Sequence, residues 1–214
     1  MNIPVNKKNL TIQIYESIKN EIISGEFQPG EQVVTNEIAK YNNISLMPVR
    51  DALNKLTDDG LLYKKSRVGY FVRKFSKEEV ENIMEVRKMY EVYSLEEYFS
   101  FINKSKLKRL LESMEAQEKN LSENIFDELD YELHKHIVTA SKNSYLIENY
   151  YGMSDVIELF RKLDKFRIEK AHKEHINIIK KILNEQKKEA KLLLIKHLDG
   201  VKDSILKEYN YWKD

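Results

Sequence analysis

The sequence of 214 residues predicts a mainly α-helical protein with two domains. Residues 34–56 spell two short amphipathic helices joined by a polar turn, and residues 61–73 read as two short strands around a basic turn. From Ser76 onward only helical periodicity is found. We therefore expect a winged helix-turn-helix domain over residues 1–75 and an all-α antiparallel bundle of about six helices over residues 76–214.

The first helix follows a polar lead-in over residues 1–9. Apolar residues recur in it at helical spacing, namely Leu10, Ile14, Ile18 and Ile22. Gly25 can end this helix, and the Gly- and Pro-rich residues 25–31 predict a turn into the next one. We expect the first helix to support the helix pair that follows.

The two short helices have recognisable boundaries. The first, over residues 35–41, is stopped by Asn42 and Asn43, which tolerate a left-handed backbone. Ser45 is a good N-cap for the second, and Pro48 falls in its first turn, where a missing N–H has no intrahelical partner to lose. The buried stripe of the second helix comprises Val49, Ala52, Leu53 and Leu56.

The free face of the second helix carries Leu46, Met47, Arg50 and Asn54. Arg and Asn near the start of a short helix suit insertion into the DNA major groove, where they reach base edges and phosphates. Helix pairs of this kind also occur as ordinary packing units, so the hairpin that follows matters. Gly60 fits the C′ position of the helix, and Lys64, Lys65 and Arg67 in the hairpin are available for contacts with the DNA backbone.

These residues resemble the N-terminal domain of GntR-type bacterial transcription regulators. The ordered matches are PG at 29–30, NEIA at 36–39, S-x-x-PVRDAL at 45–53, DGLL at 59–62 and GYFV at 69–72. The resemblance implies that Ser45, Arg50 and Gly69 face DNA. It departs from the family pattern at Leu46, where the family usually has Arg.

The candidate DNA-binding residues are therefore Ser45, Leu46, Met47, Arg50, Lys65, Arg67 and Gly69. For Arg50 the alternative is a surface salt bridge with Asp51 or Asp59. For Leu46 and Met47 two interpretations stay open, an exposed apolar pair without a role and contact with a thymine methyl group.

Composition excludes several other classes of protein. The chain has no cysteine, so disulfides, thiolate metal sites and cysteine nucleophiles are absent. The net charge is +1, but residues 1–75 contain 11 basic and 8 acidic residues, which favours a nucleic-acid partner for this domain. No apolar run resembles a signal peptide or a membrane span, so we expect a cytoplasmic protein without a membrane partner.

The second domain is predicted to be entirely helical, because 139 residues contain two glycines and no proline. Ser76 and Glu79 have capping-box spacing and mark its start. The expected helices cover residues 76–101, 105–120, 123–141, 143–163, 165–184 and 187–210.

Four residues of this domain carry metal-ligand chemistry. Asp130 and His134 are one helical turn apart and share a face, while His175 and His197 each lie in register with apolar residues of their own helices. A carboxylate and three histidines converging from three helices would make a metal site. Taken singly, each histidine is more often a hydrogen-bonded core residue than a ligand.

The second domain resembles the FCD ligand-binding domain of the FadR-like subgroup of these regulators. The matching residues are D-x-x-x-H at 130–134, S-x-N at 141–143, EH at 174–175 and HL at 197–198. The resemblance implies that Asp130, His134, His175 and His197 bind a divalent metal ion, with zinc as first choice and nickel or manganese as alternatives.

The resemblance also implies a small carboxylic acid as effector, held at its far end by an arginine. Arg87 occupies the E-x-R motif, and its alternative is an ion pair with Glu91 one turn later. Asn143 and Tyr145 are candidates for the pocket, and Arg161 and Arg167 are further arginines. His136 is expected at the surface, and the role of His172 stays open.

The two halves together predict a homodimeric DNA-binding transcription regulator, a repressor, whose affinity for a two-fold-symmetric operator is modulated by the effector at the metal site. One alternative is a metal-free helical scaffold with DNA binding only, and another is a regulator for which the metal itself is the signal. We do not expect an enzyme, because no H-E-x-x-H motif is present and HKEH at 172–175 has the wrong spacing for a metal hydrolase.

Overall fold

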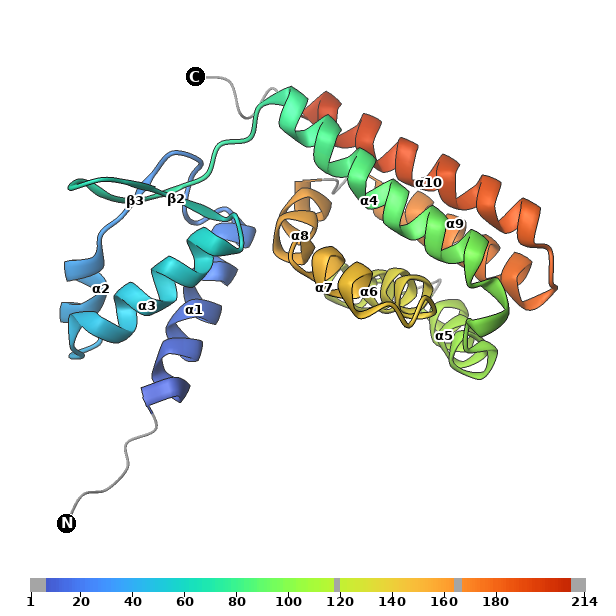
Figure 1. Cartoon of the computed structure of the whole chain (residues 1–214), viewed down its shortest axis with the longest axis horizontal. Coiled ribbons are helices and arrows are strands. Elements are labelled where there is room, and N and C mark those ends of the chain that lie inside the picture. Colours follow the sequence, from blue (N-terminus) through green and yellow to red (C-terminus); the bar gives the residue numbers. More distant parts are fainter. Residues whose placement is uncertain (1–6, 118–119, 164–166, 209–214) are drawn as a thin grey trace, which may run out of the picture. The chain divides into compact units, whose positions relative to one another are not determined.

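The computed structural model describes residues 7–117, 120–163 and 167–208 (Figure 1). The described chain forms two compact units. Of the described residues, the first unit contains 7–75 together with Gly152–Lys162, and the second contains those between Ser76 and Tyr151 together with 163 and 167–208. Residues 152–162 therefore pack with the N-terminal unit, although the sequence prediction assigns them to the C-terminal domain.

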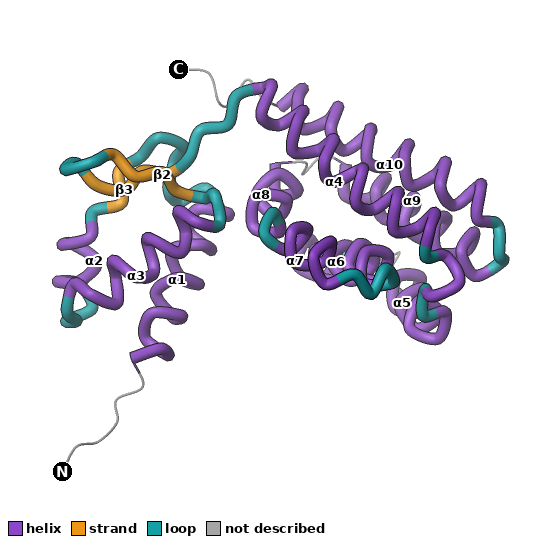
Figure 2. The backbone as a smooth tube through the Cα atoms, in the orientation of Figure 1, coloured by secondary structure: helices purple, strands orange, loops and turns teal. Residues whose placement is uncertain are grey.

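The N-terminal unit has the predicted winged helix-turn-helix. Its helices are α1 (Lys7–Ser24), α2 (Thr35–Tyr41) and α3 (Leu46–Asp58), and its strands are β1 (Gln32–Val33), β2 (Leu62–Lys65) and β3 (Gly69–Val72). The strands form one antiparallel sheet in the order β1-β3-β2, coloured orange in Figure 2. Strand β1 was not predicted from the sequence, because two residues are too few to show a periodicity. It forms by pairing with β3, where Gln32 lies opposite Phe71 and Val33 opposite Tyr70.

The predicted buried stripe of α3 is confirmed, since all four of its residues have 0% exposed surface. It packs against α1, where Ile18 and Ile22 are 3% exposed. The turn residues behave as expected: Asn43 has a left-handed φ of 53°, and Gly60, directly after the C-cap of α3, has a φ of 80°. These turns fix the angle at which α3 presents its free face.

The C-terminal unit is helical throughout its described residues. It contains α4 (Lys77–Glu97), a short 3₁₀ turn (Phe99–Phe101), α5 (Lys104–Ala116), α6 (Glu123–Thr139), α7 (Ser144–Tyr151), α9 (Ile168–Leu183) and α10 (Lys187–Glu208). The capping box predicted at the start of α4 is present, because Ser76 Oγ accepts from the Glu79 amide and the Glu79 carboxylate accepts from the Ser76 amide. In Figure 1 α4 and α10 run along each other, and the two helices are in contact.

The helix predicted over 143–163 is wrong in one respect, because it is broken into α7 and α8 (Ser154–Leu163). The break falls at Gly152 and Met153, and glycine weakens a helix because it loses the most backbone freedom on folding. Other helices end within a few residues of prediction, α5 at 116 and the α4 helix at 97. The predicted ends at 165 and 210 lie outside the described residues.

Candidate functional site

The first candidate surface lies on the free face of α3 and on the hairpin of β2 and β3, the wing. Met47 is 67% exposed and Leu46 37%, and Ser45, Arg50, Lys65 and Arg67 are also exposed. Ser45 has the backbone angles of an N-cap, but its side chain makes no capping hydrogen bond. Its hydroxyl is therefore available to a partner, as the DNA-facing prediction requires.

A groove of about 470 Å³ joins the two elements of this surface. Arg50 and Asn54 line it from α3, and Lys64, Lys65, Arg67 and Gly69 line it from the wing. Tyr70 donates a hydrogen bond of 2.7 Å to Asn54 Oδ1 and so fixes that carboxamide at the groove. No ion pair joins Arg50 to Asp51 or Asp59 among the described residues. The groove thus gathers positive charge where a phosphate backbone would run.

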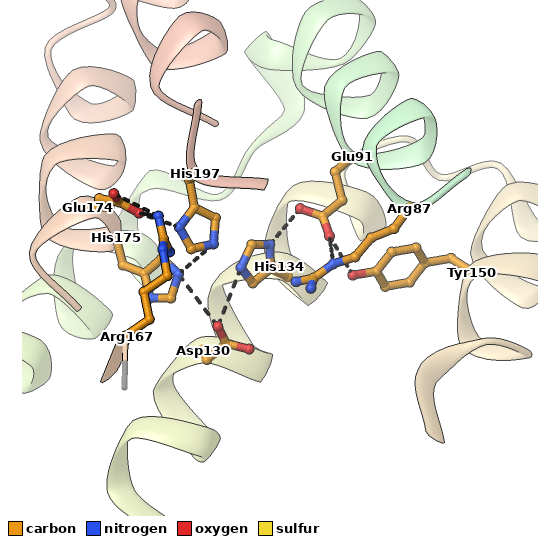
Figure 3. Close-up of polar contacts among 9 residues, drawn as sticks. All are labelled: Arg87, Glu91, Asp130, His134, Tyr150, Arg167, Glu174, His175 and His197. Carbon is orange, nitrogen blue, oxygen red and sulfur yellow. Dashed lines mark hydrogen bonds and ion pairs between the residues drawn. The ribbon is translucent and has the colours of Figure 1, made fainter. Parts of the chain in front are cut away.

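The second candidate site is a buried group of four residues, the aspartate-histidine cluster, formed by Asp130 and His134 of α6, His175 of α9 and His197 of α10 (Figure 3). All four are at most 6% exposed, and one ligand atom of each lies within 4.8 Å of the others. Asp130 Oδ1 is 3.6 Å from His134 Nε2 and 3.5 Å from His175 Nε2. His175 Nε2 is 3.1 Å from His197 Nε2.

Two glutamates orient the imidazole rings of this cluster. His134 Nδ1 is 2.5 Å from Glu91 Oε2, and His197 Nδ1 is 2.8 Å from Glu174 Oε2. A carboxylate at Nδ1 holds the proton on that nitrogen, so Nε2 presents its lone pair to the centre of the cluster. The sequence analysis named Glu91 only as a partner of Arg87 and Glu174 only as part of a motif, so their role beside the histidines was missed.

The donor set fits a metal ion. His134 Nε2 is buried and has no hydrogen-bond partner among the described residues. A buried polar atom without a partner costs free energy, and a cation at the centre would supply the missing interaction. Three imidazole nitrogens and one carboxylate oxygen suit zinc, nickel or manganese, and they do not select one of them.

Electrostatics leave three of the four ligands ready for an ion. Burial lowers the pKa of His134, but Glu91 outweighs burial and raises this pKa to about 9, so the ring must lose a proton when it binds an ion. Burial and the neighbouring histidine hold the pKa of His175 and of His197 well below the usual value, so both rings are neutral at pH 7. Burial opposes the charge of Asp130, but His134 and His175 keep its pKa below the usual range. Burial likewise opposes the charge of Glu91, and His134 and Arg87 nevertheless lower its pKa to about 2.

Arg87 takes part in this network through Glu91. Its Nε donates to Glu91 Oε1 at 2.8 Å, and Tyr150 of α7 donates to the same oxygen at 2.9 Å. The ion pair considered as the alternative for Arg87 is therefore the contact that the structure contains. Arg87 is 2% exposed, and it lies on the same side of the cluster as His134 (Figure 3).

Arg167 takes the equivalent place beside His197. Its Nη2 donates to both oxygens of Glu174, at 2.9 and 2.7 Å. The guanidinium lies against α10 at Gly200, where a Cβ would be 2.4 Å from Nη2. Each of these two imidazoles is thus held by a carboxylate that is in turn held by an arginine.

Several predicted residues lie elsewhere. Asn143 caps α7 by accepting from the Leu146 amide, and Tyr145 is 78% exposed, so the structure does not bring them to the cluster. The tyrosine of α7 that lies beside the cluster is Tyr150, which donates to Glu91. The prediction that His136 lies at the surface is wrong, because its side chain is only 13% exposed. It lies outside the cluster. His172 is buried and its Nε2 lies 2.9 Å from the Met114 carbonyl oxygen, so it faces α5.

Comparison with known proteins identifies the family of each part of the chain. Residues 10–72 match the model of the bacterial regulatory proteins of the gntR family, and residues 82–200 match that of the FCD domain. The uncharacterized HTH-type transcriptional regulator YdhC of Bacillus subtilis (strain 168) is 27% identical over 195 residues, which are 88% of this chain and 87% of YdhC.

Solved structures agree with this fold. McbR/YncC of E. coli has a TM-score of 0.75 at 16% identity, covering 94% of this chain and 99% of the other. The FCD domain of TM0439 with Zn²⁺ bound has a TM-score of 0.59 at 30% identity, covering 62% of this chain and 95% of that domain. In the part of the chain that is described, no helix has the length and apolar character that crossing a membrane requires.

Proposed function

From the premise that this chain belongs to the gntR family of bacterial regulatory proteins, carries an FCD domain and is a transcriptional regulator, we propose that a divalent metal ion and a small carboxylic acid at the aspartate-histidine cluster control its affinity for operator DNA. The ion of choice is zinc, which the FCD domain of TM0439 contains. We further infer that the protein is a repressor and that the acid releases it from DNA.

One observation carries the metal part of this proposal. The Nε2 atoms of His134, His175 and His197 converge with Asp130 Oδ1, while carboxylates occupy Nδ1 of two of these rings. Metal-bound histidines are characteristically held in this way, with the second ring nitrogen donating to a carboxylate. A histidine that only satisfies core polarity needs no such convergence of four ligand atoms.

The bound ion would supply open coordination positions for an oxygen of the acid. The protein residues would hold the ion and orient its ligands. The aspartate-histidine cluster would hold the ion, and the Glu91 and Glu174 carboxylates would keep the rings oriented. Arg87 and Arg167 are paired with Glu91 and Glu174, so the positive charge that favours an anionic ligand would come mainly from the ion.

The proposal of a carboxylic-acid effector is tested by measuring the DNA dissociation constant of the zinc-loaded protein. The DNA is a duplex that the protein has selected from a random pool. Each of a panel of small mono-, di- and hydroxycarboxylates is then added in turn. A change in the DNA dissociation constant of about 5- to 150-fold with at least one acid is expected. An affinity that no acid changes would contradict a carboxylate effector, and if zinc nevertheless changes that affinity, the metal itself would be the signal.

The DNA-facing groove leads to a prediction for Arg50. A homodimer would place two copies of α3 on the half-sites of a symmetric operator, with Arg50 at each major groove. Arg50→Ala is expected to weaken binding by about 1–3 kcal/mol per protomer, measured by fluorescence anisotropy at several salt concentrations. If Arg50 contacts phosphate rather than a base, the loss falls equally on all sequences and the salt dependence becomes shallower.

The matched control for Arg50 is Lys108→Ala, which removes one exposed positive charge from α5, far along the chain from the groove. It should leave operator affinity within twofold, roughly the scatter of the assay. Equal losses in the two variants would show that net charge, and not the groove, determines binding.

A further inference from the structure

Helix α8 belongs to the C-terminal part of the sequence, yet it packs within the N-terminal unit. Phe160 of α8 is 1% exposed, and its ring meets that of Phe75 edge to face, with 5.0 Å between the centroids. Val156 lies against Gly60, the glycine that ends the turn after α3. The apolar side of α8 is thus part of the core of the DNA-binding unit.

A set of polar contacts, here called the Asp155 clasp, fastens α8 to α1 and to the end of α3. Asp155 Oδ1 accepts from Lys19 Nζ at 2.6 Å, and Glu158 lies 3.0 Å from the same nitrogen. Tyr15 hydrogen-bonds to Asp155 and lies 2.8 Å from Oδ2 of Asp59, the C-cap of α3. Lys19 and Asp155 have side chains only 16% and 13% exposed, so solvent screens their pair weakly.

Described residues before and after α8 belong to the network around the aspartate-histidine cluster. Tyr150, four residues before the start of α8, donates to Glu91, which holds His134. Arg167, four residues after its end, donates to Glu174, which holds His197 (Figure 3). The two carboxylates that orient the rings are therefore the same two that anchor the chain on either side of α8.

We propose that α8 is the element that couples the aspartate-histidine cluster to the DNA-binding helices. A ligand that fixes His134 and His197 also fixes Glu91 and Glu174, and through them the two segments that lead into and out of α8. The Asp155 clasp then passes the position of α8 to α1 and to the end of α3. This inference rests on the proposed function, because it needs a ligand at the cluster.

A second covalent route exists, since β3 ends at Val72 and α4 begins at Lys77. The two routes differ in their residues, and only the route through α8 uses Asp155. Coupling between two sites is reciprocal, so the same clasp would let DNA change the affinity for the ion. A substitution in the clasp should therefore uncouple two binding events without weakening either.

The test uses the full chain and zinc as the probe. The DNA dissociation constant is measured by anisotropy with zinc and after chelation, for the wild type, for Asp155→Asn and for Lys19→Gln. The control is Asp203→Asn, an exposed aspartate of α10. Zinc is expected to change the DNA affinity of the wild type and of the control by about 5- to 150-fold. In both clasp variants the change should fall to less than about twofold, while zinc affinity, measured against a chelating dye, stays at the wild-type value.

Hydrogen exchange provides a second readout. Zinc should alter amide exchange in α8 and around Tyr15 of the wild type, and in Asp155→Asn the alteration should stop at α8. An undiminished effect of zinc on DNA affinity in the clasp variants would overturn the inference in favour of the direct connection. Zinc that binds without changing wild-type DNA affinity would also overturn it, whereas a protein that binds no zinc would refute the proposed metal site itself.

Discussion

Replacing His175 by alanine is expected to abolish tight retention of the metal. Wild-type protein purified without a histidine tag or chelator should contain about one transition-metal ion per chain, and His175→Ala roughly a tenth or less. His175 is 0% exposed and its Nε2 lies near both Asp130 and His197, so its loss removes one of the four converging ligand atoms. Elemental analysis measures the content directly. Thermal unfolding provides a second measure, because an ion at 100 times its Kd stabilises the folded state by about 2.7 kcal/mol.

His172 offers a matched control on the same helix. It is 2% exposed, but its Nε2 faces the Met114 carbonyl oxygen and not the cluster. His172→Ala therefore removes an equally buried imidazole from α9 and should keep the metal. Metal retained by His175→Ala, or lost by His172→Ala, would contradict the assignment of the ligands.

Glu91→Ala is expected to lower the free energy of unfolding of the metal-free protein by about 3–5 kcal/mol. Glu91 is 0% exposed and accepts from Arg87, His134 and Tyr150, so its removal leaves buried positive charge without compensation. Urea denaturation monitored by circular dichroism measures the loss. Glu96→Ala is the control, because Glu96 pairs with Lys191 at the surface and its loss should leave the midpoint of urea unfolding nearly unchanged.

The difference in the free energy of unfolding between wild type and Glu91→Ala should depend on pH in a defined direction. The pKa of Glu91 is lowered from 4.5 to about 2, so its contribution is complete above pH 4.5 and is lost as the pH falls toward 2. Burial lowers the pKa of His134 but Glu91 raises it from 6.5 to about 9, so this contribution is complete below pH 6.5 and is lost as the pH rises through 9. The difference in the free energy of unfolding between wild type and Glu91→Ala should therefore be largest between pH 4.5 and pH 6.5. A gap that is constant from pH 3 to pH 9 would show that the charges do not cause it.

The winged helix could be predicted from sequence because its signals are local. Asn43, Ser45 and Gly60 mark turns and caps through their own backbone preferences, and the stripe of α3 repeats at one period. Strand β1 and the placement of α8 could not be predicted in this way. A helical pattern shows which face is apolar, but it does not show which unit that face will join.

The same limit applies to the aspartate-histidine cluster. The four members of the aspartate-histidine cluster lie on apolar faces and in recognisable motifs, so they could be named in advance. Glu91 contacts His134 and Tyr150 contacts Glu91 across 43 and 59 residues, so helical spacing does not predict these contacts. Arg167 lies seven residues from its partner Glu174, but outside α9, where helical spacing again gives no signal. The predicted pocket residue Tyr145 is 78% exposed, whereas Tyr150 of the same helix is 5% exposed, a difference in burial that the sequence does not show.

Gly200 has a meaning for redesign of this protein. A glycine in the middle of a helix usually invites replacement by alanine, since alanine gains about 1 kcal/mol of helix propensity. In α10 the space of the missing methyl group is filled by the Arg167 guanidinium, which a Cβ would meet at 2.4 Å. Alanine at position 200 would therefore shift the arginine away from Glu174, which orients the ring of His197. The helix would gain stability, and the geometry of the cluster would be disturbed.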